Sequence, residues 1–185
     1  MAVSNYIQSV IDAAKGKPRS IDWYRKKIKE FGNPTANNLI KAGKQSGKPY
    51  FGRLNMFFYN PKWKDKLPYY DRFPLVLPLE RYQGGFLGIN FHYLPIPLRL
   101  ALLEKLTGTF SNNQKFDEST ILKVNYNNVR NVKSIEPTIH RYLAENVKSR
   151  FRRIDADEFT LATLLPVQQF KKASAGKVWA DSRRK

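Results

Sequence analysis

Two histidines and a few central acidic residues are the side chains of this 185-residue chain that could carry acid–base chemistry. His92 lies in the stretch INFHYL, on a predicted strand, and would need a carboxylate partner to act as a general base. Asp71, Glu80 or Glu104 could approach it in space, although no spacing requires this. We therefore expect His92 to be a structural histidine bonded to the backbone, and His140 to be a solvated residue on a surface helix.

A metal-dependent nuclease is the enzymatic alternative for so basic a chain. That chemistry needs two or three carboxylates that converge on Mg²⁺, commonly with a lysine nearby. The candidates are spread over a predicted loop, strand and helix, without a compact Asp-Xn-Glu-X-Lys pattern: Asp65, Asp71, Glu80 and Glu104. The chain has no cysteine, no glycine-rich phosphate loop with its Lys and Ser or Thr, and no serine nucleophile motif. We predict no catalytic residue, no metal site and no cofactor.

The charge of the chain favours an acidic partner. It holds 33 Lys and Arg against 15 Asp and Glu, a net charge of +18, whereas roughly 2–8 charges are enough to keep a small domain soluble. Two stretches interleave basic and aromatic side chains, as stacking surfaces for nucleic acid do. Lys62, Trp63, Lys64 and Lys66 form the first, and Arg150, Arg152 and Arg153 flank Phe151 in the second. Alternatively, Trp63 and Phe151 anchor the core and the lysines shield a sheet edge from pairing.

Both ends of the chain are basic. The first 50 residues carry ten basic and three acidic side chains, and apolar spacing predicts helices over 4–15, 20–31 and 35–42, followed by a Gly/Lys/Ser/Pro linker over 43–50. We interpret residues 1–49 as a basic helical arm whose partner contacts include Arg25, Lys26, Lys27 and Lys29. Residues 171–185 hold six basic residues and one Asp and form a predicted basic tail, with Lys171, Lys172, Arg183 and Arg184 as candidate contacts to nucleic acid or an acidic partner.

The intervening residues, 50–170, form the predicted core domain. A strand is expected from Tyr50 to Asn60, and two apolar runs around Gln83-Gly84-Gly85 predict a β-hairpin. Pro74 and Pro78 make its first strand an edge strand or one bent at a bulge. Gly88 indicates a bulge or a close backbone approach in its second strand.

Helices are predicted to pack on this sheet. Apolar spacing places them over 96–107, over 134–148 and, starting at Asp155 or Asp157, over ADEFTLATLL. The stretch STILKVNYNNVRNV is expected to hold a strand that leads into a short helix. The predicted fold class is α+β, with a small bent antiparallel sheet or SH3-like barrel over about 50–95.

The central sequence also resembles a known family. The stretch FFYNPKWKDKLPYYDRFPLVLPLERYQGGFLGINFHYLP, followed by LPVQQFKKA and VWADSRRK, is similar to a small protein of contractile-tailed phages of the T-even and marine cyanophage type. The similarity covers about residues 50–185 and leaves the first 50 residues outside it. It implies either a protector of packaged DNA ends or a virion or tail component, and it carries over no catalytic residue.

These observations lead to a ranked set of functions. The first is a non-enzymatic structural component of a contractile-tailed phage virion, in the tail, baseplate or head–tail region, whose basic arms bind other phage virion proteins and double-stranded DNA. The alternative is a DNA-end-binding protector that acts in packaging or injection, and a nuclease is third. Because no run approaches the roughly 18 apolar residues of a membrane helix and the first residues lack a signal-peptide pattern, we expect synthesis in a cytoplasm and no membrane partner. The resemblance implies that this is the bacterial host cytoplasm and that the protein resides in the virion, and no small-molecule substrate is evident.

Overall fold

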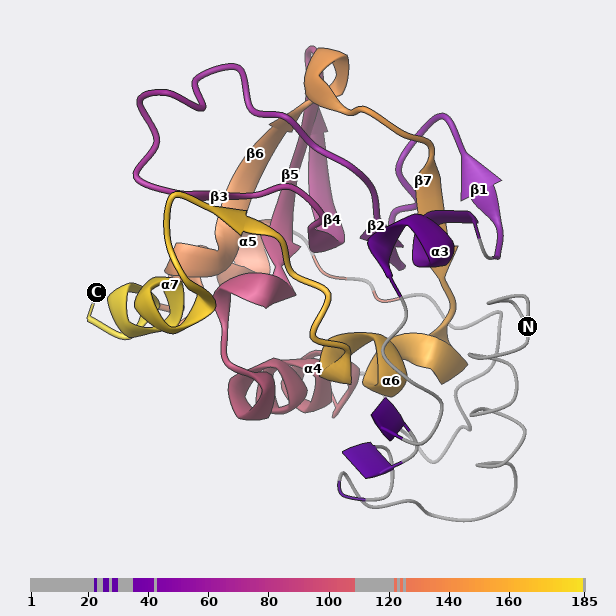
Figure 1. Cartoon of the computed structure of the whole chain (residues 1–185), viewed down its shortest axis with the longest axis vertical. Coiled ribbons are helices and arrows are strands. Elements are labelled where there is room, and N and C mark those ends of the chain that lie inside the picture. Colours follow the sequence, from indigo (N-terminus) through magenta and orange to yellow (C-terminus); the bar gives the residue numbers. More distant parts are fainter. Residues whose placement is uncertain are drawn as a thin grey trace.

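The computed structural model describes most of the chain from residue 35 onward (Figure 1). The described residues are 22, 25, 26, 28, 29, 35–41, 43–108, 122, 124 and 126–184, without the side chains of 107, 108, 128 and 157. The predicted helix over 4–15 lies outside them. Of the predicted helix over 20–31, five residues are described and all five are helical, and helix α3 (Ala36–Lys41) confirms the third.

A six-stranded antiparallel sheet is the centre of the fold, with strand order β1-β7-β2-β4-β5-β6. Its strands are β1 (Gln45–Ser46), β2 (Leu54–Met56), β4 (Leu75–Tyr82), β5 (Gly85–Asn90), β6 (Ile139–Leu143) and β7 (Phe151–Ile154). In the described part of the chain β1 and β6 are its two edges, so the sheet is open. The α+β class with an antiparallel sheet is confirmed, and the described strands do not close into the SH3-like barrel offered beside it.

The predicted hairpin is formed by β4 and β5, which turn at Gln83-Gly84. β4 lies between β2 and β5, so the expectation of an edge strand is wrong. The pairing register shifts between Pro78 and Glu80, which confirms the bulge, and a bulge is where an interior strand tolerates proline. Gly88 pairs with Pro78 and confirms the close approach, because a Cβ there would lie 2.4 Å from Val76 Cγ1.

The predicted helix over 134–148 is wrong. The segment forms 3-10 turns η2 (Glu136–Thr138) and η3 (Ala144–Asn146) on either side of strand β6, which pairs with β5 along its length. Pro137 disfavours a continuous helix at this point. Gly85 lets the strands approach, because a Cβ on it would lie 2.0 Å from the Tyr142 carbonyl oxygen. Tertiary pairing with β5 thus overrides the helical spacing of the apolar residues.

The other helices agree better with the sequence. α4 (Ile96–Gly108) confirms the helix over 96–107. Asp155 and Glu158 form a capping box at η4 (Ala156–Glu158), which leads into α6 (Phe159–Leu164), as the predicted helix start at Asp155 required. In the stretch STILKVNYNNVRNV the described residues form the short helix α5 (Tyr126–Val129) and no strand.

The sheet buries side chains on both faces. Leu75, Leu77 and Leu79 of β4 belong to the larger core, which includes buried residues of α4 and α6, two helices that lie side by side across one end of the strands (Figure 1). Val76 points to the opposite face, into a smaller cluster of Phe57, Tyr59, Phe86, Tyr142 and Phe151. The alternation of neighbouring residues between two cores is what a strand buried on both faces requires.

The C-terminal segment is folded against this body. Strand β8 (Phe170–Lys171) pairs with β3 (Tyr70–Asp71), and α7 (Ala175–Ser182) begins at the N-cap Ser174 and buries Val178 completely. The linker expected over 43–50 contains β1, which pairs with β7. The division of the chain into arm, core and tail remains a prediction, but parts of both predicted end segments pack on the core.

We expect Gly88→Ala to lower the free energy of unfolding by about 1–3 kcal/mol, because the new methyl group overpacks a buried site beside Val76. Gly47→Ala is the matched control, since a Cβ at Gly47 meets nothing within 4 Å. Urea unfolding followed by circular dichroism measures both. Equal midpoints for the two variants would contradict the close approach.

Candidate functional site

A basic loop of residues 61–68 presents an exposed tryptophan. Turn hydrogen bonds from the Lys66 and Leu67 amides to the Trp63 carbonyl shape it. Trp63 is 59% exposed, with the Lys66 and Lys62 Nζ atoms 4.9 Å and 5.9 Å from its ring centroid. The sequence left two roles open for Trp63, and its exposure excludes that of a core anchor. Trp63 instead presents an aromatic face that is flanked by cations.

The basic loop is tied to the C-terminal segment. Lys172 Nζ donates hydrogen bonds of 2.9 Å to the carbonyls of Asp65 and Leu67. Lys172 holds a positive φ of 68°, which a non-glycine residue rarely adopts, and Lys171 pairs with Tyr70 across β3 and β8. The structure thus brings Lys171 and Lys172 beside the basic loop, more than a hundred residues away in sequence.

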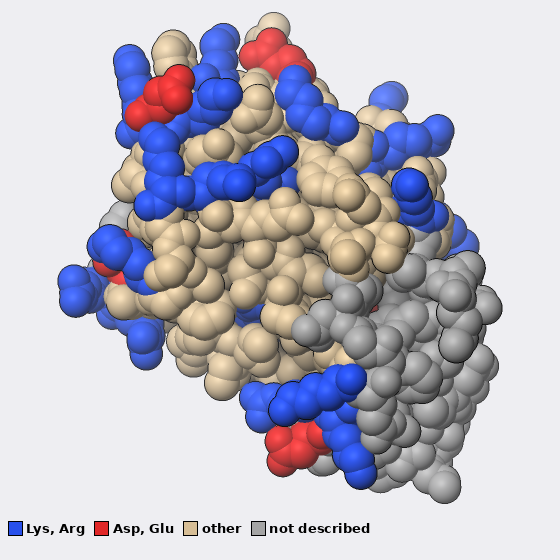
Figure 2. Space-filling model, viewed as in Figure 1, with Lys and Arg blue, Asp and Glu red and all other residues tan. Residues whose placement is uncertain are grey.

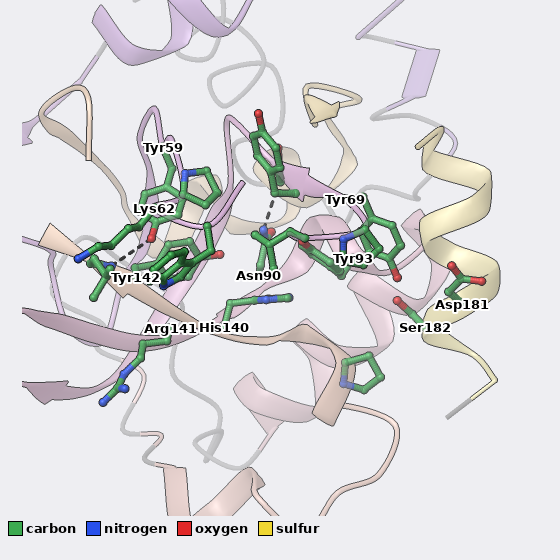
Figure 3. A pocket seen from close by; sticks show the side chains of 18 residues that line it. Tyr59, Lys62, Tyr69, Asn90, Tyr93, His140, Arg141, Tyr142, Asp181 and Ser182 are labelled. Carbon is green, nitrogen blue, oxygen red and sulfur yellow. Dashed lines mark hydrogen bonds between the residues drawn. The ribbon is translucent and has the colours of Figure 1, made fainter. Parts of the chain in front are cut away.

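A cavity of about 550 Å³ lies behind the basic loop (Figure 3). Its lining comes from residues 59–71, from Asn90 and Tyr93 at the end of the hairpin, from residues 137–143, and from the end of α7. Aromatic side chains dominate it: Tyr59, Trp63, Tyr69, Tyr70, Tyr93 and Tyr142. Burial raises the pKa of Tyr93 and of Tyr142 above the ordinary value of 10.0, so both hydroxyls stay neutral.

The two ends of this aromatic cavity differ in charge. Figure 3 shows Lys62 at one end and Asp181 with Ser182 at the other, separated by tyrosines, while the Arg141 side chain points away from them. Arg141 stacks on the Tyr82 ring at 4.0 Å, and Lys177 pairs with Asp181 at 3.0 Å. The cavity can therefore hold a flat ligand that carries a negative charge at one end.

Beneath the cavity the carboxylate of Asp71 collects hydrogen bonds from distant parts of the chain. It accepts from His92 Nδ1 at 2.7 Å and from the amides of Phe73 and Gln169 at 3.0 Å and 2.9 Å, with Asn90 Nδ2 farther away at 3.4 Å. Burial alone would raise the pKa of Asp71, but His92 and the two amides outweigh it and hold that pKa below 3.8. Asp71 is thus a buried anion with its acceptors filled.

Arg99 is the buried cation of the same region. Its guanidinium donates to the carbonyls of Leu94 (2.7 Å) and His92 (3.4 Å) and stacks on the Trp179 ring at 5.7 Å. Burial lowers the pKa of Arg99 to about 10, although Asp71 raises it, so the guanidinium stays charged at neutral pH. Trp179 Nε1 donates to the His92 carbonyl at 2.9 Å, which joins α7 to the end of the hairpin.

His92 and Asp71 have the geometry of a general base and its orienting carboxylate, but neither side chain is accessible from solvent. Their side chains are 0% and 1% exposed, so no substrate can reach the ring without local unfolding. The pair supports the expected structural role of His92, with the Asp71 carboxylate as the partner of its Nδ1. Among the described residues, no group of three His, Asp or Glu side chains is arranged to hold a metal ion.

The second predicted basic stretch is mostly inside the protein. Phe151 is 4% exposed and belongs to the smaller core cluster, as the core-anchor alternative expected. Arg152 is buried and bonds Glu158 at 3.0 Å, and Arg153 contacts Asp155 at 2.6 Å. Arg150 is exposed, so it is the member of this stretch that is free to face a partner.

The other residues that were predicted to contact a partner lie on the protein surface, as far as the structure describes them. Arg183 and Arg184 are exposed directly after α7, next to the Asp181 end of the cavity. Arg25, Lys26 and Lys29 are exposed, with Arg25 paired to Asp22 at 3.3 Å, and Lys27 lies outside the described residues. Figure 2 shows Lys and Arg gathered along the top and left of the visible face, over the loop between β2 and β3 and over α7.

Sequence reasoning did not single out the tyrosines of the cavity or Arg141. Arg141 and His140 were assigned to a helix, and only their true placement on β6 directs neighbouring side chains to opposite faces. The alternating pattern of the sequence IHRYL, which is typical of a strand, was the signal that could have predicted β6. Tyr69 and Tyr93 stood in the most aromatic part of the sequence, but their convergence depends on contacts between distant segments.

An α+β protein with a basic, aromatic-lined surface is thus the class that fold and site define. Residues 2–182 match the family described as phage T4 terminal DNA protecting protein, and the chain belongs to that family. No curated protein and no solved structure matches it. No helix in the described part of the chain has the length and apolar content to cross a membrane.

Family membership changes two expectations. The match includes the first 50 residues, which the similarity seen in the sequence had left outside. It identifies a phage protein and supports the DNA-end protector, which was the alternative, better than a structural tail component; tail, baseplate and contractile-tail roles receive no support. The family is not a class of enzymes, so it gives the nuclease no support either.

We expect the free energy of unfolding to fall as pH falls below about 6.5, by up to about 1.4 kcal/mol per pH unit. Burial holds the pKa of His92 below its ordinary 6.5, although Asp71 raises it. The unfolded ring therefore takes up a proton before the folded ring does, which favours unfolding. The lowered pKa of Asp71 acts in the same direction at lower pH, below about 3.8.

Urea unfolding at pH 7.0, 6.0 and 5.0 measures this dependence, with His92→Gln as the comparison. The variant should be less stable throughout and should lose most of the slope between pH 6.5 and 5. A wild type that becomes more stable on acidification would show that His92 is charged in the folded protein.

Proposed function

We propose that this protein binds the ends of linear double-stranded DNA and shields them from exonucleases. The observation that carries the proposal is membership, over residues 2–182, of a family described as terminal DNA protecting protein. The proposed contact surface is the basic loop together with Lys171, Lys172, Arg183 and Arg184. Arg150 and the basic residues 25, 26, 27 and 29 are proposed as outlying contacts.

The charges of the basic loop suit a phosphate backbone. Lys62 pairs only loosely with Glu145, at 3.7 Å between two exposed side chains. Lys64 and Lys66 form no ion pair with another described residue and are exposed. Unpaired lysines of this kind release counterions when they meet phosphates, which gives sequence-independent, salt-sensitive binding.

The exposed tryptophan is well placed to stack on the end of a DNA duplex. Inside a duplex each base pair is covered on both faces by its neighbours, whereas the last pair offers one open face. Trp63 stands out from the loop with 59% of its surface exposed and with lysines on its flanks. An aromatic face stacks on any base, so this contact is independent of sequence.

Exonuclease digestion of a linear duplex in the presence of the protein tests the proposal. We expect protection of the ends at roughly 50 mM salt, loss of protection as salt rises, and competition by linear DNA in preference to circular DNA. Failure to bind linear duplex at that salt concentration would refute the proposed function.

The double variant Lys64→Ala/Lys66→Ala tests the surface itself. It should weaken binding and reduce the slope of log K against log salt by about 2, one per lost phosphate contact. Lys41→Ala/Lys48→Ala is the matched control, because these lysines are also exposed and form no ion pair with another described residue. Equal slopes for the two double variants would place the DNA elsewhere on the protein.

Residence in the phage particle and binding to other virion proteins remain proposals. DNA packaged in a particle has exposed ends, so we expect a protein that protects DNA ends to be present in the particle. Mass spectrometry of purified heads and tails tests this directly, and absence of the protein from both would remove the virion role.

A further inference from the structure

We propose that the aromatic cavity receives one unpaired nucleotide at the terminus of a DNA strand. The inference rests on the proposed function and deepens it, because it gives the protein a means to distinguish an end from the interior of a duplex. Phosphate contacts alone cannot do this, since the backbone looks the same at both places.

The cavity has the size and walls for a nucleotide. Its volume of about 550 Å³ falls within the usual range for sites that hold small ligands. The rings of Tyr69 and Tyr93 lie 6.1 Å apart, and His140 stacks against Tyr93 at 4.1 Å. Flat aromatic walls of this kind accept a base of any identity.

The charge distribution fixes how the nucleotide would lie. Lys62 supplies positive charge for the phosphate at one end, whereas the Arg141 guanidinium points away from the cavity and stacks on the Tyr82 ring. At the other end stands Ser182, which is 7% exposed and whose hydroxyl has no hydrogen-bond partner in the described part of the chain. A buried hydroxyl without a partner calls for an explanation, and a polar group of a bound base or sugar would supply the missing bond.

Asp181, beside Ser182, agrees with this orientation. Its carboxylate is paired with Lys177 at 3.0 Å, which reduces its repulsion of an anionic ligand. It is still an acceptor and can receive a hydrogen bond from an exocyclic amine of a base or from a sugar hydroxyl. The phosphate would therefore face Lys62 rather than this end.

The mouth of the cavity favours a terminal nucleotide. Trp63, Leu67 and Pro68 contribute to its lining from the basic loop, which Lys172 holds in place. A base within the duplex would have to leave its partner and both stacking neighbours to enter the cavity. An unpaired terminal base has no partner to leave, so its entry costs less free energy. The cavity would thus select overhanging or frayed ends.

Fluorescence of 2-aminopurine tests the inference on the wild-type protein. The probe is placed at the unpaired end of a short 5′ overhang, of a short 3′ overhang, or at an internal paired position of a duplex closed by hairpins at both ends. We expect quenching at one of the two overhangs and none at the internal position. Quenching that is equal at all three positions, or absent from both overhangs, would overturn the inference.

Leu67→Trp should block the cavity from its mouth. Leu67 is 37% exposed, so the larger side chain can be accommodated without disturbing the core. The variant should lose the quenching and bind the overhang about tenfold more weakly than the wild type. Leu98→Trp is the matched control, because Leu98 is 41% exposed on α4 and does not line the cavity. Unchanged quenching in Leu67→Trp would overturn the inference.

The outcomes separate this inference from the function on which it rests. If exonuclease protection persists but overhangs are bound no better than hairpin-closed duplex, the protein is an end protector without a nucleotide cavity. If neither protection nor salt-sensitive binding is seen, the proposed function itself fails. Matching urea midpoints for the two Trp variants establish that any difference between them is not a folding defect.

Discussion

The carboxylate of Asp71 is a charge buried away from water, and the arrangement of the chain around it satisfies that charge. Its donors come from the residues after β3, from the end of the hairpin and from Gln169, which lies 98 positions further along the chain. An unpaired anion at this place would be costly, and removal of one partner from a buried charged set typically destabilises a protein by about 3–5 kcal/mol. Asp71 therefore helps to fix how the C-terminal segment meets the sheet.

The cavity depends on that junction. Its walls come from both sides of Asp71: Tyr69 and Tyr70 directly before it, and the end of α7, which Trp179 holds against the His92 carbonyl. Lys172 fastens the basic loop to the same C-terminal segment. The lysines, Trp63 and the aromatic cavity are thus parts of one connected unit, so a DNA end would meet a surface that is already formed.

The features that the sequence predicts well are local. The β4–β5 hairpin follows from two apolar runs around Gly84-Gly85, and α4 from apolar spacing bounded by Pro97 and Gly108. β6 was mistaken for a helix because its apolar spacing also fits one, and the deciding interaction is its pairing with β5, some 50 residues earlier. Trp63 and Phe151 look alike in sequence, each among basic residues, yet one is exposed and the other is core. The cavity could not be predicted because its walls converge from four separate segments.

Photo-crosslinking from the terminal nucleotide is the most direct test of binding to DNA ends, because it reports which part of the protein touches a DNA end. A linear duplex with 5-iodouracil at its terminal position would be irradiated with the protein, and the crosslinked peptides identified by mass spectrometry. We expect crosslinks within residues 59–71, 90–93, 137–143 or 171–184, and none when the same base lies inside a hairpin-closed duplex. Crosslinks confined to β1 and β7, or equal yields from terminal and internal positions, would contradict it.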